Sequence, residues 1–187
     1  MAKVLERSLY EEDYYAWTKA QAAELRRMAA RRVNSALDLE NLAEEVESLG
    51  RSDLATVRSQ IRRIIEHLLK LEYSPSAEPR LGWRESIIEA RDVIPDVMTA
   101  TLRREVEADL AKTYGQGRRR ADVALRRHGE HDAAKALPAT YPYGFEQIVA
   151  QDWYPQNRHA SSTTRTPDDG VPRQRGERPR TFPSRAP

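Results

Sequence analysis

The sequence predicts an all-α protein, a single helical bundle built on an antiparallel helix hairpin at about residues 37–73. Between residues 37 and 50, apolar side chains recur every three or four positions, which is the spacing of one buried helix face. The same spacing continues from residue 54 to residue 71. Gly50, between the two stretches, is a typical C-terminal stop signal, and Ser52 or Asp53 would cap the next helix. The two stripes consist of Leu39, Leu42, Val46 and Leu49, and then of Leu54, Val57, Ile61, Ile64, Leu68 and Leu71.

A first helix is expected at about residues 10–32, ahead of the hairpin. Acidic residues in its first turn and arginines in its last turn complement the helix dipole. Its apolar stripe begins with aromatic side chains, which we interpret as core packing because aromatic residues dominate protein cores. These side chains are Tyr10, Tyr14, Tyr15 and Trp17.

The segment 74–82 follows the hairpin and contains two prolines, which end a helix because proline removes a backbone donor. A fourth helix is expected from Trp83, and Pro95 should kink or break it. Thr99 or Thr101 would then cap a fifth helix.

Two glycines, Gly115 and Gly117, interrupt the next apolar pattern, so we expect a bend there before a helix at 118–128. A short last helix is expected at 145–151. Five large apolar side chains near it should dock on the body and close the core, since so many are rarely left in water. They are Phe145, Ile148, Val149, Trp153 and Tyr154.

Several segments resemble a known bacterial family, domain of unknown function 29, which is common in cyanobacteria and proteobacteria. They are DLENLAEEVESLGRSD at 38–53, HLLKLEYSP at 67–75, GWRESI at 82–87 and YPYGFEQIVAQDWYP at 141–155, and the opening LYEEDYYAWTKAQAAELR at 9–26 also fits. The resemblance extends over about residues 9–155 in the same order. It implies a short, all-helical bacterial protein and brings no reaction, cofactor or catalytic residue with it.

The composition favours one domain, residues 1–155, followed by a disordered tail rich in Pro, Arg, Ser and Thr at 156–187. The tail holds seven arginines against three acidic residues, whereas the body has a net charge of −2. The basic character of the chain therefore belongs to the tail. The absence of cysteine excludes thiol chemistry. No apolar run is long enough for a signal peptide or a membrane span, so we expect a cytoplasmic protein without a membrane partner.

A polar row flanks the first stripe of the hairpin, and it is the candidate polar site. If the chain turns at Gly50, His67 comes level with Asp38, and Glu45 comes close to two arginines of the second helix. The structural interpretation is that Asp38 or Asn41 hydrogen-bonds His67 and that Glu44 or Glu45 pairs with an arginine. The alternative is a metal-assisted hydrolase or nuclease that uses Asp38, Glu45 and His67. The candidate residues are Asp38, Asn41, Glu45, Arg58, Arg62 and His67.

Two further motifs give weaker indications of a binding site. His128 and His131 have a spacing that could bind zinc or nickel, but Gly129 between them disfavours a rigid helix. The basic run from Arg118 to Arg127 could contact phosphates together with the tail, although runs of charge are usually solvated faces.

The sequence therefore favours a small helical binding or regulatory protein that acts through contacts with another protein. Phosphate loops, nucleophile elbows and zinc-protease motifs are absent from it, and it predicts no cofactor and no metal. Nonspecific nucleic-acid contact is the second alternative after the hydrolase. The partner, the biological process and the oligomeric state do not follow from the sequence.

Overall fold

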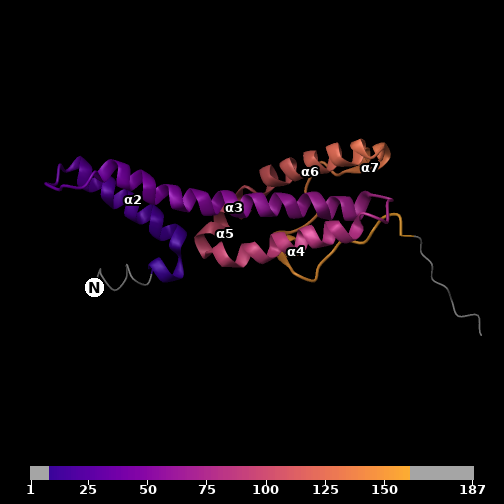
Figure 1. The fold of residues 1–187 in the computed structure, drawn as a ribbon, viewed down its shortest axis with the longest axis horizontal. Helices are drawn as coiled ribbons and strands as arrows, with labels where there is room; N and C mark the ends of the chain where they lie inside the picture. Colours follow the sequence, from indigo (N-terminus) through magenta and orange to yellow (C-terminus); the bar gives the residue numbers. More distant parts are fainter. Residues whose placement is uncertain (1–8, 161–187) are drawn as a thin grey trace, which may run out of the picture.

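The computed structural model describes residues 9–160, and in this range it is all-helical, as predicted. The helices are α2 (Tyr14–Ala30), α3 (Leu39–Tyr73), α4 (Arg80–Val97), α5 (Ala100–Ala108), α6 (Leu110–Arg127), α7 (His131–Ala136) and α8 (Phe145–Val149). Figure 1 shows α3 running through the length of the molecule, with α2 beside its first part and α4 and α6 beside its second part. None of the helices in this range is long and apolar enough to span a membrane.

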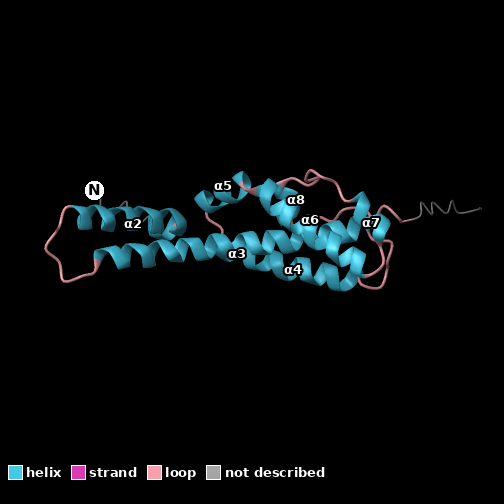
Figure 2. Ribbon diagram, turned by 90° about the horizontal axis from the view of Figure 1, so that it is seen from above, coloured by secondary structure: helices cyan, strands magenta, loops and turns pink. Residues whose placement is uncertain are grey.

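The central element is α3, a single helix of 35 residues and thus about 52 Å long. The predicted hairpin at 37–73 is therefore wrong, because the chain does not turn at Gly50. The hairpin that does form joins α2 to α3 through residues 31–38 (Figure 2). Its antiparallel pairing is fixed by the ion pair of Arg26 with Glu47 and by the crossing of α2 over Gly50.

Gly50 is buried inside α3 because α2 approaches the backbone closely there. A Cβ at this position would collide with Thr18 Oγ1 and would lie 3.2 Å from the Tyr15 ring. The glycine thus marks a helix crossing and not a helix end. It allows Tyr15, Thr18 and Ala22 to form the buried face of α2.

The aromatic side chains at the start of α2 divide between the core and the surface. Tyr15 is buried, whereas Tyr14 and Trp17 are half-buried and Tyr10 is exposed. The rings of Tyr10, Tyr14 and Trp17 pack on one another, and the Tyr14 and Trp17 rings are stacked with their centres 5.5 Å apart. Only Tyr15 fulfils the predicted core role, since the buried face of α2 is rotated from the predicted stripe.

Helix α4 lies antiparallel to α3, and α6 lies parallel to it. Arg63 of α3 pairs with Glu89 of α4, while Lys70, further along α3, reaches back to Trp83. Pro95 lies in the last turn of α4, which continues for two residues beyond it to Val97. Thr99 caps α5, as one of the two predicted alternatives, by accepting a hydrogen bond from the backbone of Leu102.

The predicted bend at Gly115 and Gly117 is wrong, since both glycines lie within the continuous helix α6. Gly117 is buried against α3, where a Cβ would meet Ile65 at 2.9 Å and the carbonyl oxygen of Arg62 at 3.0 Å. It permits the close approach of α6 to α3, as Gly50 does for α2. The core lies between α3, α4 and α6, around fully buried side chains such as Ile61, Ile64, Ile65, Leu68, Ile87 and Leu125.

Arg91 of α4 holds the last helix and the segment after it. The residue is 1% exposed, and its guanidinium donates to the carbonyl oxygens of Ile148 (2.9 Å), Trp153 (3.0 Å), Gln147 (3.2 Å) and Gln151 (3.2 Å). Burial lowers the pKa of Arg91, and the nearby Tyr154 and Asp152 partly offset this effect. The apolar groups at 145–154 dock on the body, as predicted, but around a buried cation.

The folded chain continues beyond the predicted boundary at residue 155. Asn157 Nδ2 donates to the carbonyl oxygens of Leu71 (2.9 Å) and Ser74 (2.8 Å). The backbone N–H of Arg158 donates to the carbonyl oxygen of Glu72 (2.9 Å). Residues 157–159 therefore satisfy the terminal carbonyl groups of α3 and belong with the helical body. The rest of the predicted disordered tail, 161–187, lies outside the described residues.

Substitution of Gly117 by Ala tests the close crossing of α6 and α3. We expect a loss of about 1 to 2 kcal/mol in the free energy of unfolding, because overpacking against the Arg62 backbone outweighs the better helix propensity of alanine. Gly115→Ala is the matched control on the same helix. Its nearest contact is Arg119 Nη1 at 3.8 Å, so it should stabilise by about 0.5 to 1 kcal/mol. Urea unfolding of both variants checks the two signs, and equal effects would contradict the assignment.

A chain that ends at Pro155 should be about 2 to 3 kcal/mol less stable than one that ends at Ala160. The longer chain keeps the hydrogen bonds that Asn157 and Arg158 make to the end of α3. Their loss leaves the carbonyl oxygen of Glu72 without this partner and those of Leu71 and Ser74 with Arg80 alone. Asn157→Ala in the longer chain should account for about 1 to 2 kcal/mol of this difference. Denaturant unfolding of the three chains measures it, and equal midpoints would show that these contacts add nothing to stability.

Candidate functional site

The six residues of the candidate polar site do not come together. Asp38 and His67 are 29 positions apart on one continuous helix, which separates them by about 43 Å. Glu45 and Arg62 are likewise about 25 Å apart along the helix. The prediction that His67 lies level with Asp38 is wrong, because it depended on a turn at Gly50. The proposed hydrolase site of Asp38, Glu45 and His67 therefore does not form.

At the start of α3, Asp38 is the N-cap and accepts hydrogen bonds from the backbone N–H of Asn41 (3.2 Å) and from its side-chain amide (2.6 Å). Glu45 is exposed and makes no ion pair with any residue in the described range 9–160. The predicted ion pair of Glu44 or Glu45 with Arg58 or Arg62 is thus wrong.

The two arginines contact α6 instead. Arg58 pairs with Asp109, and Arg62 donates to Gln116 Oε1 (3.3 Å) and to Ser59 Oγ (3.1 Å). Together with the approach of Arg120 to Glu66 (4.0 Å), these pairs show that α3 and α6 run in the same direction.

His67 lies about four-fifths of the way along α3. Its Nδ1 atom is buried and without a hydrogen-bond partner in residues 9–160. Burial lowers the pKa of His67 to about 3, and the positive charges of Lys70 and Arg63 act in the same direction. The imidazole is therefore neutral at physiological pH.

His128 and His131, the second candidate metal pair, lie on two different helices. His128 caps the end of α6, Gly129 takes a left-handed φ of +79°, and His131 begins α7. Over the stretch from residue 9 to residue 160, no three His, Cys, Asp or Glu side chains lie together as a metal site would require.

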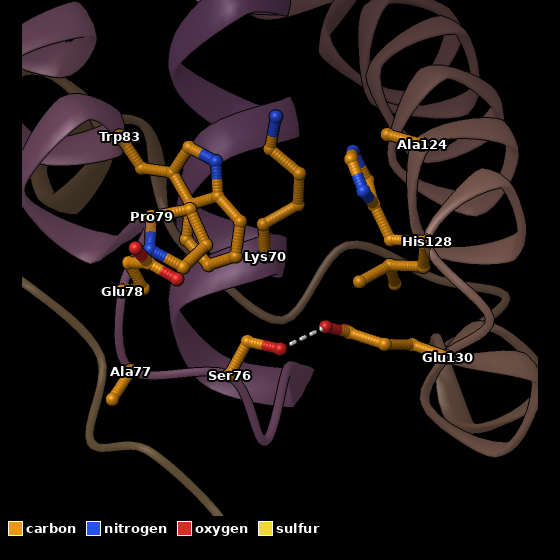
Figure 3. A pocket seen from close by; sticks show the side chains of 10 residues that line it. Lys70, Ser76, Ala77, Glu78, Pro79, Trp83, Ala124, His128 and Glu130 are labelled. Carbon is orange, nitrogen blue, oxygen red and sulfur yellow. Dashed lines mark hydrogen bonds between the residues drawn. The ribbon is translucent and has the colours of Figure 1, made fainter.

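A pocket of about 660 Å³, called here the Trp83 pocket, lies between the ends of α3, α4 and α6. Figure 3 shows Trp83 and His128 on opposite walls, with Lys70 between them. At its lower edge, Ser76 Oγ donates to Glu130 Oε1 (2.5 Å). The lining residues are Lys70, Ser76, Ala77, Glu78, Pro79, Trp83, Ala124, Leu125, His128 and Glu130.

Two groups of the Trp83 pocket have unusual surroundings. Burial lowers the pKa of Lys70, although the neighbouring Glu66 carboxylate at 3.3 Å works against this. The Lys70 ammonium also lies over the Trp83 ring, 5.2 Å from its centre. Glu130 Oε2 is buried and has no hydrogen-bond partner within residues 9–160, whereas the other oxygen of this carboxylate accepts from Ser76.

A second hollow, called here the arginine groove, adjoins the pocket and shares Ala124 and His128 with it. It has a volume of about 720 Å³ and lies between α3 and α6. Its lining residues are Arg62, Glu66, Gln116, Arg119, Arg120, Val123, Ala124, Arg127 and His128. Most of the predicted basic run of Arg118 to Arg127 therefore faces this groove, although Arg118 itself turns to the carbonyl oxygen of Leu137.

The comparisons with known proteins agree with this architecture. The family model described as "Domain of unknown function DUF29" matches residues 9–154. The chain belongs to the DUF29 family. A crystal structure of an alpha-helical protein of unknown function from Rhodospirillum rubrum ATCC 11170 is similar, with a TM-score of 0.67 and 25% sequence identity over 77% of this chain and 90% of that one. None of the curated proteins matches the chain.

The DUF29 assignment confirms the resemblance found in the sequence, and the helical neighbour confirms the all-α class. Neither carries a reaction or a ligand to this chain.

Sequence reasoning missed the Trp83 pocket in this DUF29 protein. One weak signal was present, since Lys70 interrupts the apolar run LLKLEY, although at 100° per residue it lies about 200° round the helix from Leu68 and thus outside the predicted stripe. Glu130 had no such signal, because only the packing of the α6–α7 turn against residues 74–79 brings it to Ser76.

The pH dependence of stability tests the environment of His67. Because its folded-state pKa is depressed, its contribution is fully present above about pH 6.5, and it is lost as the pH falls toward 3. When the pH falls from 7 to 5, the parent chain should lose about 1 kcal/mol more unfolding free energy than the variant His67→Phe, which has no imidazole to protonate. This figure allows for the partial exposure of the ring. Urea unfolding at both pH values measures this, and the other histidines cancel in the comparison. Parallel pH profiles would contradict a buried neutral His67.

Proposed function

We propose that this DUF29 protein is a binding or regulatory protein that engages another protein through the arm formed by α2 and residues 39–50 of α3. The observation that carries the proposal is a pair of exposed leucines in an acidic surrounding. Leu42 and Leu49 are 37% and 48% exposed. They lie seven positions apart and thus on one face of α3, with Glu45 between them.

The architecture of the arm supports this role. Its two helices pack on each other through small buried residues such as Ala22, Ala43 and Gly50, so the outer face of α3 is not needed for their contact. Figures 1 and 2 show the arm extending away from α4, α6, α7 and α8. The two leucines therefore project from a part of the molecule that the remaining helices do not cover.

The charge of the arm indicates the chemistry of the partner. Residues 38–49 contain five acidic side chains and no lysine or arginine. Glu47 pairs with Arg26 (2.5 Å) and Arg51 (3.3 Å). The other four, Asp38, Glu40, Glu44 and Glu45, form no ion pair within the described part of the chain. A partner segment with apolar residues flanked by lysine or arginine complements this surface.

The double variant Leu42→Ser/Leu49→Ser, in the full chain, tests the proposal. Because the two side chains are 37% and 48% exposed, the double variant should lose about 1 to 3 kcal/mol in the free energy of unfolding and stay folded, which circular dichroism checks. Binding of the partner should fall at least tenfold. Leu81→Ser/Ile88→Ser on α4 is the matched control, since these residues are 73% and 43% exposed outside the arm, and it should bind normally.

The partner can be identified with a photo-crosslinking residue at position 45, in cells that carry the protein, with position 85 on α4 as the control site. The expected product is specific to position 45, is lost in the leucine variant and maps to an apolar and basic segment of the partner. Equal crosslinking from both positions, or a crosslinked second copy of this chain, would refute the proposal.

A further inference from the structure

We infer that the arginine groove and the Trp83 pocket together bind single-stranded nucleic acid, with phosphates along the groove and one base in the pocket. This inference is independent of the proposed protein contact, since the groove lies on the opposite half of α3 from the arm. The proposed site combines arginines of the basic run at 118–127 on α6 with residues of α3 and α4.

The first argument is the excess of positive charge in the groove. Four arginines and His128 line it against one carboxylate, Glu66. That carboxylate is already engaged by Lys70 at 3.3 Å. Arg62 is bonded only to the neutral Gln116 and Ser59. A groove lined by one sign of charge attracts a polyanion, and phosphate contacts supply most of the affinity for nucleic acid.

The second argument is that two of the arginines are available. Arg119 and Arg127 are exposed and form neither an ion pair nor a side-chain hydrogen bond within residues 9–160. Arg126, an exposed residue of the same helix, is instead paired with Asp122 at 2.9 Å. Arg119 and Arg127 are eight positions apart, which spaces them by about 12 Å along α6. This spacing lets the two arginines contact different phosphates of one strand and not a single phosphate group.

The third argument is the chemistry of the adjoining pocket. Trp83 and His128 form its opposite walls (Figure 3), and aromatic walls beside a basic groove are typical of proteins that bind unpaired bases. Lys70, between the two walls, adds a positive charge that can meet the phosphate of the bound nucleotide. A base can enter such a pocket only when it is not stacked in a duplex, so the site favours single strands.

The test is fluorescence anisotropy with a labelled 12-nucleotide single strand and the full-length protein. Arg119→Gln/Arg127→Gln should weaken binding at least tenfold and lower the slope of log K against log salt concentration by about 1 to 1.5. Arg104→Gln/Arg126→Gln is the matched control, because it removes the same charge from exposed positions outside both hollows. It should bind like the parent chain, and circular dichroism checks that both variants are folded.

A strand of the same length with abasic sites separates the two parts of the inference. It keeps the phosphates and lacks the bases, so it should bind several times more weakly than the normal strand. The inference is overturned if the two arginine variants bind equally, if the abasic strand binds as tightly as the normal one, or if a duplex or a mononucleotide binds as tightly as the single strand.

Discussion

The continuity of α3 is the constraint on which the rest of the structure depends. Because the helix passes through Gly50 without a turn, α2 packs on its first half, while α4 and α6 pack on its second half. Two close crossings make this possible, one at Gly50 under α2 and one at Gly117 against α3. In each case, the missing side chain brings two backbones together, and the interaction gained offsets the lower helix propensity of glycine.

The second half of α3 is completed by polar contacts that reach far along the sequence. The buried guanidinium of Arg91 gathers four carbonyl groups from residues 147–153, and Asn157 and Arg158 return to the end of α3. A buried cation without these carbonyl groups would be costly, so the C-terminal segment and α4 depend on each other. This arrangement also brings Tyr143 to Glu72, whose hydrogen bond and burial raise the pKa of that tyrosine well above its usual value.

The long helix also separates two surfaces of opposite charge. Acidic residues surround Leu42 and Leu49 on the arm, and four arginines line the groove between α3 and α6. The net charge of the body hides this division, because the two charges nearly cancel. A rigid helix that carries an acidic arm and a basic groove could present one protein partner and one nucleic-acid partner at a fixed distance, which is the combined outcome of the two proposals.

The sequence by itself determined the all-α class, the family, the starts of α3, α5 and α8, a threonine cap at Thr99 or Thr101, and the docking of Phe145 and Ile148, because periodicity and capping are local properties. It misjudged Gly50, Gly115 and Gly117, since a glycine that ends a helix and a glycine that lets another helix approach have the same local signature. That one choice placed Asp38 beside His67, although the helix holds them about 43 Å apart. Only the tertiary structure decided which residues share a site. Trp83, Lys70, His128 and Glu130 meet because three helices and one turn converge, and no spacing within a single segment encodes that convergence.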